Sequence, residues 1–301
     1  MRAAALVGFG GVEQLELREM PEPTTGPGDV KVRVVAASIN PIDWKLRQGG
    51  KRPGMTLALP AILGRDAAGE VVEVGSEVRR FRVGARVTGL VMGAYAERVV
   101  AKEEAWAEVP PTLDLGDAAA IPLVTLTGAQ LIEEAVGANS GDVVLVTGAL
   151  GSVGRAAVFV AKSRGVKVWA GVRQTQKGAA AALGVEGVVA LDDEVDRQRL
   201  PVLDGIADTV GGATVESVLG KVRHGGTVGT VVGDPAGARE KGIQVRHHWA
   251  HPDPDRLAAM VRAVAEGHLV VPIAKRFSLS QIREAQQLAE KGAGGKVLVA
   301  P

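Results

Sequence analysis

The sequence of 301 residues contains no cysteine. This absence excludes a disulfide framework, a zinc site built on thiolates and a cysteine nucleophile, and it fits a reducing compartment. The N-terminal segment MRAAALVGFGG has no apolar core of signal-peptide length, so we expect a cytoplasmic protein. We also find no apolar run of the length that a bilayer-spanning helix needs, so no membrane association is expected.

Aromatic residues and net charge are scarce as well. Only 3% of the residues are aromatic whereas 46% are hydrophobic, so aliphatic side chains must fill the core. The 35 basic and 34 acidic residues nearly cancel, which argues against nucleic acid as a partner. A chain of this length favours two domains.

Two patterns of secondary structure divide the chain. The first third is rich in β structure, with Val-dense runs at 30–39 and 69–75 bounded by Gly, Pro and Asp, and it predicts a barrel-like β domain. From Asp142 strands and helices alternate, which is typical of a doubly wound parallel α/β domain. This alternation ends after Gly242. We therefore predict a β domain from residues 1–120 and 252–301, with an α/β domain, residues 121–251, inserted between them.

One helix of the α/β domain is predicted from its apolar spacing. Val215, Val218, Leu219 and Val222 recur at the intervals that place side chains on a single helical face. The spacing predicts one continuous helix through Val222.

The stretch DVVLVTGALGSVG, residues 142–154, combines a buried strand, a glycine turn and the start of a helix. Such a turn offers free backbone N–H groups and the positive end of a helix dipole, which suit a phosphate. Gly151 would let the phosphate approach, and Gly154 would let the helix pack on the strand. This context favours a dinucleotide over a turn without a ligand. The cofactor-binding candidates are Ala149, Gly151, Ser152, Val153 and Gly154.

The end of the second strand of this domain selects the cofactor. Enzymes that use NAD carry an acidic residue about twenty residues after the loop, and this chain has Gly171 at that place. Arg173 follows two residues later and Lys177 lies beyond it, so we expect no carboxylate there. A guanidinium can bind a 2′-phosphate through two hydrogen bonds. The sequence therefore predicts NADPH rather than NADH, with Arg173 and Lys177 as ligands of the phosphate.

In order and spacing, a series of motifs resembles the zinc-free quinone oxidoreductase branch of the medium-chain dehydrogenase/reductase superfamily. The resemblance covers nearly the whole chain, and it implies a GroES-like β-barrel domain with an inserted Rossmann domain. The motifs are ASINPIDWKLRQG, LPAILGRDAAGEVVEVGSEVRRFRVGARV, GAYAERVV, AAAIPLVTLTGAQLI, VLVTGALGSVG, ADTVGG, HGGTVGTVVG and GAGGKVLV.

The resemblance also implies chemistry without a metal. Zinc-using relatives place a cysteine in the segment that matches SINPID and a histidine where this chain has Arg65, so we expect no catalytic zinc. Hydride transfer to a quinone or an α,β-unsaturated carbonyl needs only a few donors for the product oxyanion. The expected function is therefore an NADPH-dependent reduction of such acceptors. An enoyl-thioester reductase and a non-catalytic NADPH-binding protein are the alternatives.

By this resemblance, Asn40 and Pro41 lie beside the nicotinamide, and Asn40 donates to the substrate or fixes the cofactor. Arg65 has two alternatives, which are to orient the substrate carbonyl or to pair with Asp66. Thr127 and Gly233 are expected near the cofactor.

Three further expectations concern other parts of the chain. We expect Asp43 to cap the helix that WKLRQG begins at Trp44, and Tyr95 is a less favoured candidate for a proton donor. The tyrosine that often flanks the 2′-phosphate in the family is Leu191 here.

Residues 242–250 would form an exposed sheet edge, and the family joins two such edges, so a homodimer is expected.

Overall fold

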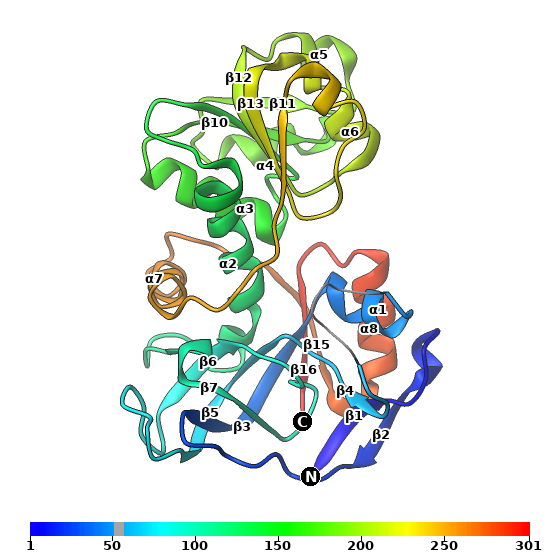
Figure 1. Cartoon of the computed structure of the whole chain (residues 1–301), viewed down its shortest axis with the longest axis vertical. Coiled ribbons are helices and arrows are strands. Elements are labelled where there is room, and N and C mark those ends of the chain that lie inside the picture. Colours follow the sequence, from blue (N-terminus) through cyan, green and yellow to red (C-terminus); the bar gives the residue numbers. More distant parts are fainter. Residues whose placement is uncertain (51–56) are drawn as a thin grey trace. The chain divides into compact units, whose positions relative to one another are not determined.

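The computed structural model describes residues 1–50 and 57–301. These residues form two compact units. Unit 1 contains Met1–Leu123 and Pro252–Pro301, and unit 2 contains Val124–His251. Unit 2 is thus inserted between two parts of unit 1, which carry the blue-to-cyan and orange-to-red ends of the chain in Figure 1.

Unit 1 is built on two sheets. The larger sheet has the order β15-β16-β3-β5-β6-β8, with β7 also paired to β3, and the smaller has the order β2-β1-β4. Its strands are β1 (Arg2–Leu6), β2 (Leu15–Glu19), β3 (Asp29–Ile39), β4 (Ala61–Ile62), β5 (Asp66–Val74), β6 (Arg86–Leu90), β7 (Arg98–Lys102), β8 (Trp106–Glu108), β15 (Ile273–Ser278) and β16 (Lys296–Ala300).

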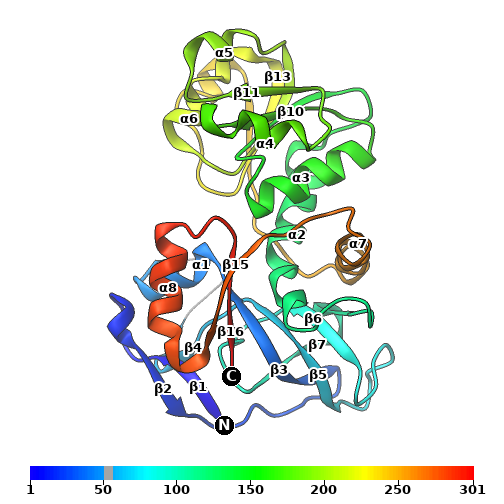
Figure 2. The same cartoon turned by 180° about the vertical axis from the view of Figure 1, so that it is seen from behind.

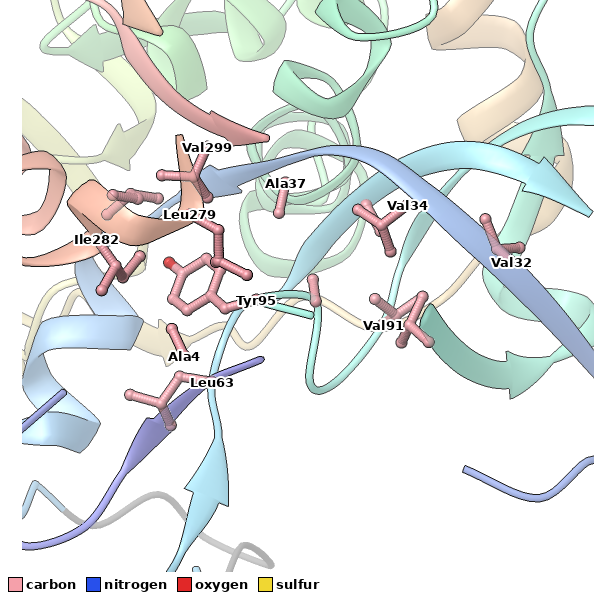
Figure 3. Close-up of a cluster of buried hydrophobic side chains, with 14 of the residues drawn as sticks. Ala4, Val32, Val34, Ala37, Leu63, Val91, Tyr95, Leu279, Ile282 and Val299 are labelled. Atoms are coloured by element: carbon pink, nitrogen blue, oxygen red, sulfur yellow. The ribbon is translucent and has the colours of Figure 1, made fainter. Parts of the chain in front are cut away.

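The described part of unit 1 has three complete α-helices and a core made mostly of aliphatic side chains. The helices are α1 (Pro41–Arg47), α7 (Pro254–Ala265) and α8 (Ile282–Lys291), and α8 lies beside α1 in both views of Figures 1 and 2. Valines that alternate along β3 enter the core, as the period of a strand requires. Figure 3 shows Tyr95 among Ala4, Leu63 and Ile282 in this core.

Unit 2 contains a parallel sheet of six strands in the order β11-β10-β9-β12-β13-β14. The chain runs outward from β9 on one side and returns to β12 on the other, which is the doubly wound topology predicted from the sequence. Ligands bind at the carboxyl ends of the strands where this order reverses. The strands are β9 (Val143–Thr147), β10 (Lys167–Val172), β11 (Gly187–Ala190), β12 (Leu203–Asp208), β13 (Val222–Thr230) and β14 (Gln244–His247).

Five α-helices connect or flank these strands. They are α2 (Pro122–Gln130), which begins in unit 1 and is continued by a π-helical segment (Leu131–Val136), α3 (Ser152–Ser163), α4 (Lys177–Ala181), α5 (Glu194–Gln198) and α6 (Gly212–Glu216).

The prediction of one continuous helix through Val222 is wrong. Helix α6 ends at Glu216, a short 3-10 turn covers Leu219–Lys221, and Val222 is the first residue of β13. The predicted residues are nevertheless all buried. Burial of a run of closely spaced apolar residues satisfies a strand and a turn as well as a helix, so the spacing alone did not decide the structure.

One helical stretch in the described part of the chain, Asp117–Val136, is long and apolar enough to cross a membrane by those two criteria. Within its most apolar window, 83% of the residues are buried inside the protein. The core helix of a soluble protein passes the same test, so this stretch is weak support for a membrane span.

Candidate active site

The glycine loop connects β9 to α3 in unit 2. Gly151 is the N-cap of α3 with extended backbone (φ −69°, ψ 161°), and no side chain caps this end of the helix. The first N–H groups of a helix have no partner within the helix, so those of Ser152 and Val153 are suited to an anion. Gly151 itself is exposed, whereas Ala149 is buried below the turn.

Two glycines of the loop serve different purposes. A Cβ atom on Gly154 would lie 2.2 Å from the carbonyl oxygen of Gly148, so the fold itself requires glycine there. A Cβ atom on Gly151 would meet only that same oxygen, at 3.2 Å, which a small shift relieves. Packing within the protein therefore explains why residue 154 is glycine. Packing does not explain why residue 151 is glycine, whereas the close approach of a ligand would.

The residue at the expected acidic position is explained by packing. Gly171 lies inside β10 and pairs with Thr147 and Val189. A Cβ atom on Gly171 would come within 2.7 Å of Leu191 Cδ1, so the side chain of Leu191 fills the space that an acidic residue would need. Arg173 follows the end of β10 and is exposed.

The expectation that no carboxylate lies near this segment is wrong. The carboxylate of Asp192 accepts a hydrogen bond of 2.7 Å from the backbone N–H of Gln174. Asp196 is buried and forms a 2.7 Å ion pair with the ammonium group of Lys177, which lowers the pKa of Asp196. The turn after β11 carries Asp192 and the following helix α5 carries Asp196, and the sequence separation of both from Arg173 hid this proximity.

Thr127 and Gly233 lie on different elements of unit 2. Thr127 is in α2, and a Cβ atom on its neighbour Gly128 would lie 2.6 Å from the carbonyl oxygen of Val153, so α2 crosses the first turn of α3 closely at this point. Gly233 follows the end of β13, and a Cβ atom there would meet no described atom within 4 Å. Gly233 therefore lies at the carboxyl end of the sheet, and Thr127 lies on the helix that packs on the start of α3.

In unit 1, the side chain of Asn40 is buried and bound on both ends. Its amide Nδ2 donates to Asp66 Oδ2 over 2.8 Å and to the carbonyl oxygen of Ser38 over 3.4 Å. Its Oδ1 accepts a 2.6 Å hydrogen bond from Lys296 Nζ. Asn40 is the N-cap of α1, and Pro41 begins the helix. These contacts hold the carboxamide in one orientation.

Asp66 is the centre of this buried cluster. Its carboxylate accepts hydrogen bonds from Ser38 Oγ (2.6 Å) and from the backbone N–H of Leu123 (2.7 Å), in addition to Asn40. Lys296 Nζ lies 3.5 Å from Asp66 Oδ2. Burial lowers the pKa of Lys296, and the carboxylates of Asp66 and Asp43 oppose that change. The cation that compensates this buried carboxylate is therefore Lys296.

The contact of Lys296 with Asp66 was not predicted from the sequence, and the pairing of Arg65 with Asp66 stays a prediction. Among the ion pairs of the described residues, Asp66 is matched by Lys296, while Nη1 of Arg65 lies 2.7 Å from Met92 Sδ. Lysine in a closing GGKVLV segment reads as an ordinary strand residue. Only the pairing of β16 with β3 brings it to Asn40.

Asp43 and Tyr95 form a second buried pair. Asp43 Oδ2 accepts hydrogen bonds from the Tyr95 hydroxyl (2.7 Å) and from the Asn40 backbone N–H (2.8 Å). The expected helix start at Trp44 is wrong, because α1 begins at Pro41 with Asn40 as its N-cap, and Asp43 is the third helical residue of a capping box. Burial raises the pKa of Asp43 to about 6, and these two hydrogen bonds limit the rise. Burial and the Asp43 charge raise the pKa of Tyr95. Tyr95 is fully enclosed, which argues against a proton donor to substrate.

Potential metal ligands are dispersed. Residues 1–50 and 57–301 contain no group of three or more His, Asp or Glu side chains arranged to hold a metal ion. His251 and Glu134 approach each other, with Nε2 3.0 Å from Oε2, and His248 lies 3.1 Å from Gln130 Oε1.

Comparison with known proteins connects these features. Residues 26–111 match the alcohol dehydrogenase GroES-like domain family, and residues 183–299 match the zinc-binding dehydrogenase family. The quinone oxidoreductase of Pseudomonas aeruginosa is 32% identical, in an alignment that covers 97% of both chains. The chain belongs to the quinone oxidoreductases of the medium-chain dehydrogenase/reductase superfamily.

Two other quinone oxidoreductase relatives extend this assignment. The solved quinone oxidoreductase of Coxiella burnetii has a TM-score of 0.90 and 28% identity, and the match covers 100% of this chain and 99% of that one. A chloroplastic quinone-oxidoreductase homolog of Spinacia oleracea is 36% identical, but that alignment spans 54% of this chain and 52% of the spinach protein.

Membership in the quinone oxidoreductases confirms the predicted fold class and the general chemistry. The GroES-like domain and the Rossmann-like parallel sheet are those of the family. Quinone oxidoreductases are oxidoreductases that bind a nicotinamide cofactor, either NAD or NADP. The strand-to-helix glycine loop of unit 2 is the part of this chain that fits such a dinucleotide.

The raised pKa of Asp43 predicts a specific pH dependence of stability. A carboxyl group with a folded pKa of about 6 and an ordinary value of 3.8 takes up a proton on folding. Its stabilising contribution is therefore complete below the ordinary value and is lost as the pH rises through the folded value. Asp43→Asn keeps the oxygen that accepts both hydrogen bonds, because both reach the same oxygen.

We expect the stability of Asp43→Asn relative to the wild type to rise by about 2 kcal/mol between about pH 4.5 and pH 7.5, at about 1.4 kcal/mol per pKa unit, because part of the full effect already develops below pH 4.5. Urea unfolding followed by circular dichroism measures the difference. Asp204→Asn is the control, because its hydrogen bonds lower the pKa of Asp204 below 3.8, so its stability relative to the wild type should stay nearly constant over this pH range. A pH-independent difference for Asp43→Asn would show that Asp43 ionises as it does in the unfolded chain.

Proposed function

We propose that this quinone oxidoreductase transfers a hydride from NADPH to a quinone or an α,β-unsaturated carbonyl, without zinc. The observation that carries the proposal is the uncapped start of α3, where Gly151 is exposed and nearly free of packing demands. The exposed guanidinium of Arg173 at the end of β10 supports NADPH. The quinone oxidoreductase relatives support the class of acceptor.

Within unit 2, we propose distinct roles along the cofactor. The N–H groups of Ser152 and Val153 would bind the pyrophosphate, next to Ala149, Gly151 and Gly154. Arg173 would bind the 2′-phosphate through two hydrogen bonds. Lys177 would contribute less than the sequence suggested, because Asp196 already holds its ammonium group. Thr127 and Gly233 would lie toward the nicotinamide.

The chemistry follows from the class of acceptor. The reduced nicotinamide supplies one hydride when bound. A quinone that accepts this hydride becomes a hydroquinone anion, and one proton from solvent completes the hydroquinone, so electrons and protons balance. The hydroquinone anion needs less stabilisation of its negative charge than an alkoxide does, so a fixed positive charge and a few hydrogen-bond donors are enough.

The residues of unit 1 would act on the acceptor in two ways. We propose that the guanidinium of Arg65 orients the acceptor carbonyl. Asn40, which we expected to donate to the substrate or to fix the cofactor, has its amide directed to Asp66 and Ser38. We therefore propose that Asn40 fixes the position of Pro41 and the start of α1 beside the nicotinamide.

Independence from zinc rests on the residue types of the chain. Cysteine is absent from all 301 residues, and Arg65 stands where zinc-using relatives have a histidine. A guanidinium is protonated at all working pH values and cannot be a ligand of a metal ion. The chain therefore lacks the ligands of that zinc site and offers a fixed positive charge at the same place.

We also propose a cytoplasmic homodimer. Strand β14 (Gln244–His247) is the edge of the six-stranded sheet, so its outer hydrogen-bonding groups are available to a second copy. Pairing of two such edges through residues 242–250 would give one continuous sheet around a two-fold axis.

Turnover with a set of acceptors tests the function. We expect the protein to oxidise NADPH in the presence of 1,4-benzoquinone or an alkenal, and to keep this activity after exhaustive chelation. Binding of NADPH is measured in parallel. Binding without turnover of any acceptor would favour a non-catalytic NADPH-binding protein, and loss of activity on chelation, restored by zinc, would contradict the proposed chemistry.

Arg173 tests the choice of cofactor. We expect Arg173→Ala to weaken NADPH binding by about ten- to a hundredfold, the loss of one charge-assisted contact, and to leave NADH binding nearly unchanged. Fluorescence titration of both nucleotides measures the two effects. Lys177→Ala is the matched comparison, and we expect a smaller loss because Asp196 competes for that ammonium group. Equal losses of NADPH and NADH in Arg173→Ala would refute the assignment.

Light scattering at micromolar concentration tests the assembly. We expect twice the mass of the 31.0 kDa chain. We expect Val245→Asp to shift the population toward the monomer, since it places a charge in β14 at the proposed junction. A wild-type protein that is monomeric under these conditions would contradict the homodimer.

A further inference from the structure

We infer that Asp208 is a positioning residue for the cofactor, because its buried carboxylate ties together the carboxyl ends of β9, β12 and β13. This inference rests on the proposed binding of a nicotinamide dinucleotide at the glycine loop. Asp208 is the last residue of β12 and is fully buried. It lies at the reversal of strand order, where the sheet binds ligands.

The first connection leads to the glycine loop. Thr147, the last residue of β9, donates from Oγ1 to Asp208 Oδ1 over 2.8 Å. The same hydroxyl accepts a 2.9 Å hydrogen bond from the backbone N–H of Thr209, whose own hydroxyl donates to the carbonyl oxygen of Thr147 over 2.7 Å. Gly148, the first residue of the loop, is therefore preceded by a residue that three hydrogen bonds fix in place.

This connection also limits the position of Gly148. Its backbone has φ +63°, and a Cβ atom there would lie 2.6 Å from Thr209 Oγ1. The carbonyl oxygen of Gly148 in turn accepts the N–H of Gly151 over 2.8 Å. A shift of Thr147 or Thr209 would thus pass through Gly148 to the N-cap of α3, where we propose that the pyrophosphate binds.

The second connection leads to Gly233. Thr230 Oγ1, at the end of β13, lies 3.0 Å from Asp208 Oδ2. The backbone N–H groups of Val232 and Gly233 both donate to this hydroxyl over 3.3 Å. The turn that carries Gly233, which we place near the nicotinamide, is therefore held through the same carboxylate as the glycine loop.

The remaining contacts fix the carboxylate itself. The backbone N–H groups of Val210 and Gly211 donate to Asp208 Oδ1 over 3.1 Å and 3.0 Å. No cation lies within ion-pair distance of Asp208 among the residues that the structure describes. Burying a carboxylate without a cation is costly, and the parallel strand pairing already holds the middle of these strands. The contacts of Asp208 lie instead at the strand ends, where the loops start.

The hydrogen bonds of Asp208 would raise nucleotide affinity by pre-organising the two binding segments. A ligand that must order a loop loses affinity, and a loop already held in its bound shape avoids that loss. Because Asp208 holds the loop at the pyrophosphate and the turn near the nicotinamide, its effect should not depend on the 2′-phosphate. Loss of the network should therefore weaken NADPH and NADH by the same factor.

Three variants test the inference. Thr147→Val keeps the shape of the side chain and removes the hydroxyl, Thr147→Ser restores the hydroxyl, and Asp208→Asn removes the oxygen that faces Thr230. We expect Thr147→Val to weaken NADPH and NADH binding by about three- to thirtyfold, as for loss of one or two buried hydrogen bonds. We expect a smaller loss for Asp208→Asn, because its amide nitrogen can donate to Thr230 Oγ1 while that hydroxyl donates to the Gly233 carbonyl oxygen. Thr147→Ser should return to within about threefold of the wild type.

Thr88→Val separates this role from a loss of stability. Thr88 is also buried, and its hydroxyl donates to carbonyl oxygens of Ala67 and Ala118 within unit 1. We expect Thr88→Val to lower the unfolding temperature about as much as Thr147→Val while leaving nucleotide affinity unchanged. Binding is measured by fluorescence titration at a temperature where all variants are folded.

The possible results are distinct. Wild-type affinities for both nucleotides in Thr147→Val and Asp208→Asn would overturn the positioning role and leave the proposed function intact. A loss confined to NADPH would also overturn it, because that pattern belongs to the 2′-phosphate and to Arg173. Binding of neither nucleotide by the wild type would overturn the proposed function, and this inference with it.

Discussion

The structure of unit 2 depends on one close approach of backbone to backbone. The first turn of α3 lies so near the end of β9 that a Cβ atom on Gly154 would be 2.2 Å from the carbonyl oxygen of Gly148. Only glycine permits this contact, and the contact directs the start of α3 to the carboxyl edge of the sheet. Gly128 of α2 also packs on this turn, where a Cβ atom would lie 2.6 Å from the carbonyl oxygen of Val153. Glycines at positions 128 and 154 therefore determine where the start of α3, the proposed anion site, lies.

Unit 1 contains charged side chains in its interior. Asp66, Lys296 and Asn40 are joined by hydrogen bonds and an ion pair in the interior, and Asp43 lies close enough for its charge to act on Lys296. Removing one member of such a set would leave another charge uncompensated. The cluster holds the Asn40 carboxamide in one orientation, and its N–H groups already donate within the protein.

Local sequence patterns predicted those parts of the structure that depend on contacts between residues close in sequence. The glycine loop was predicted because strand, turn and helix follow within residues 142–154, and the parallel sheet because its elements alternate. Contacts between distant residues could not be predicted in this way. Lys296 reaches Asn40 across 256 positions, and Asp196 reaches Lys177 across 19. The end of α6 before Val222 was missed because apolar spacing does not distinguish a buried turn and strand from a helix.

The central claim is that the glycine loop exists to bind a dinucleotide, and Gly151→Ala tests it most directly. The new Cβ atom would meet only the carbonyl oxygen of Gly148, at 3.2 Å, and the backbone of residue 151 is in a conformation that alanine adopts readily. We expect a folded protein with nearly unchanged unfolding temperature and at least tenfold weaker binding of both NADPH and NADH, since about 1.4 kcal/mol of lost contact is enough. Wild-type affinity in Gly151→Ala would contradict the account.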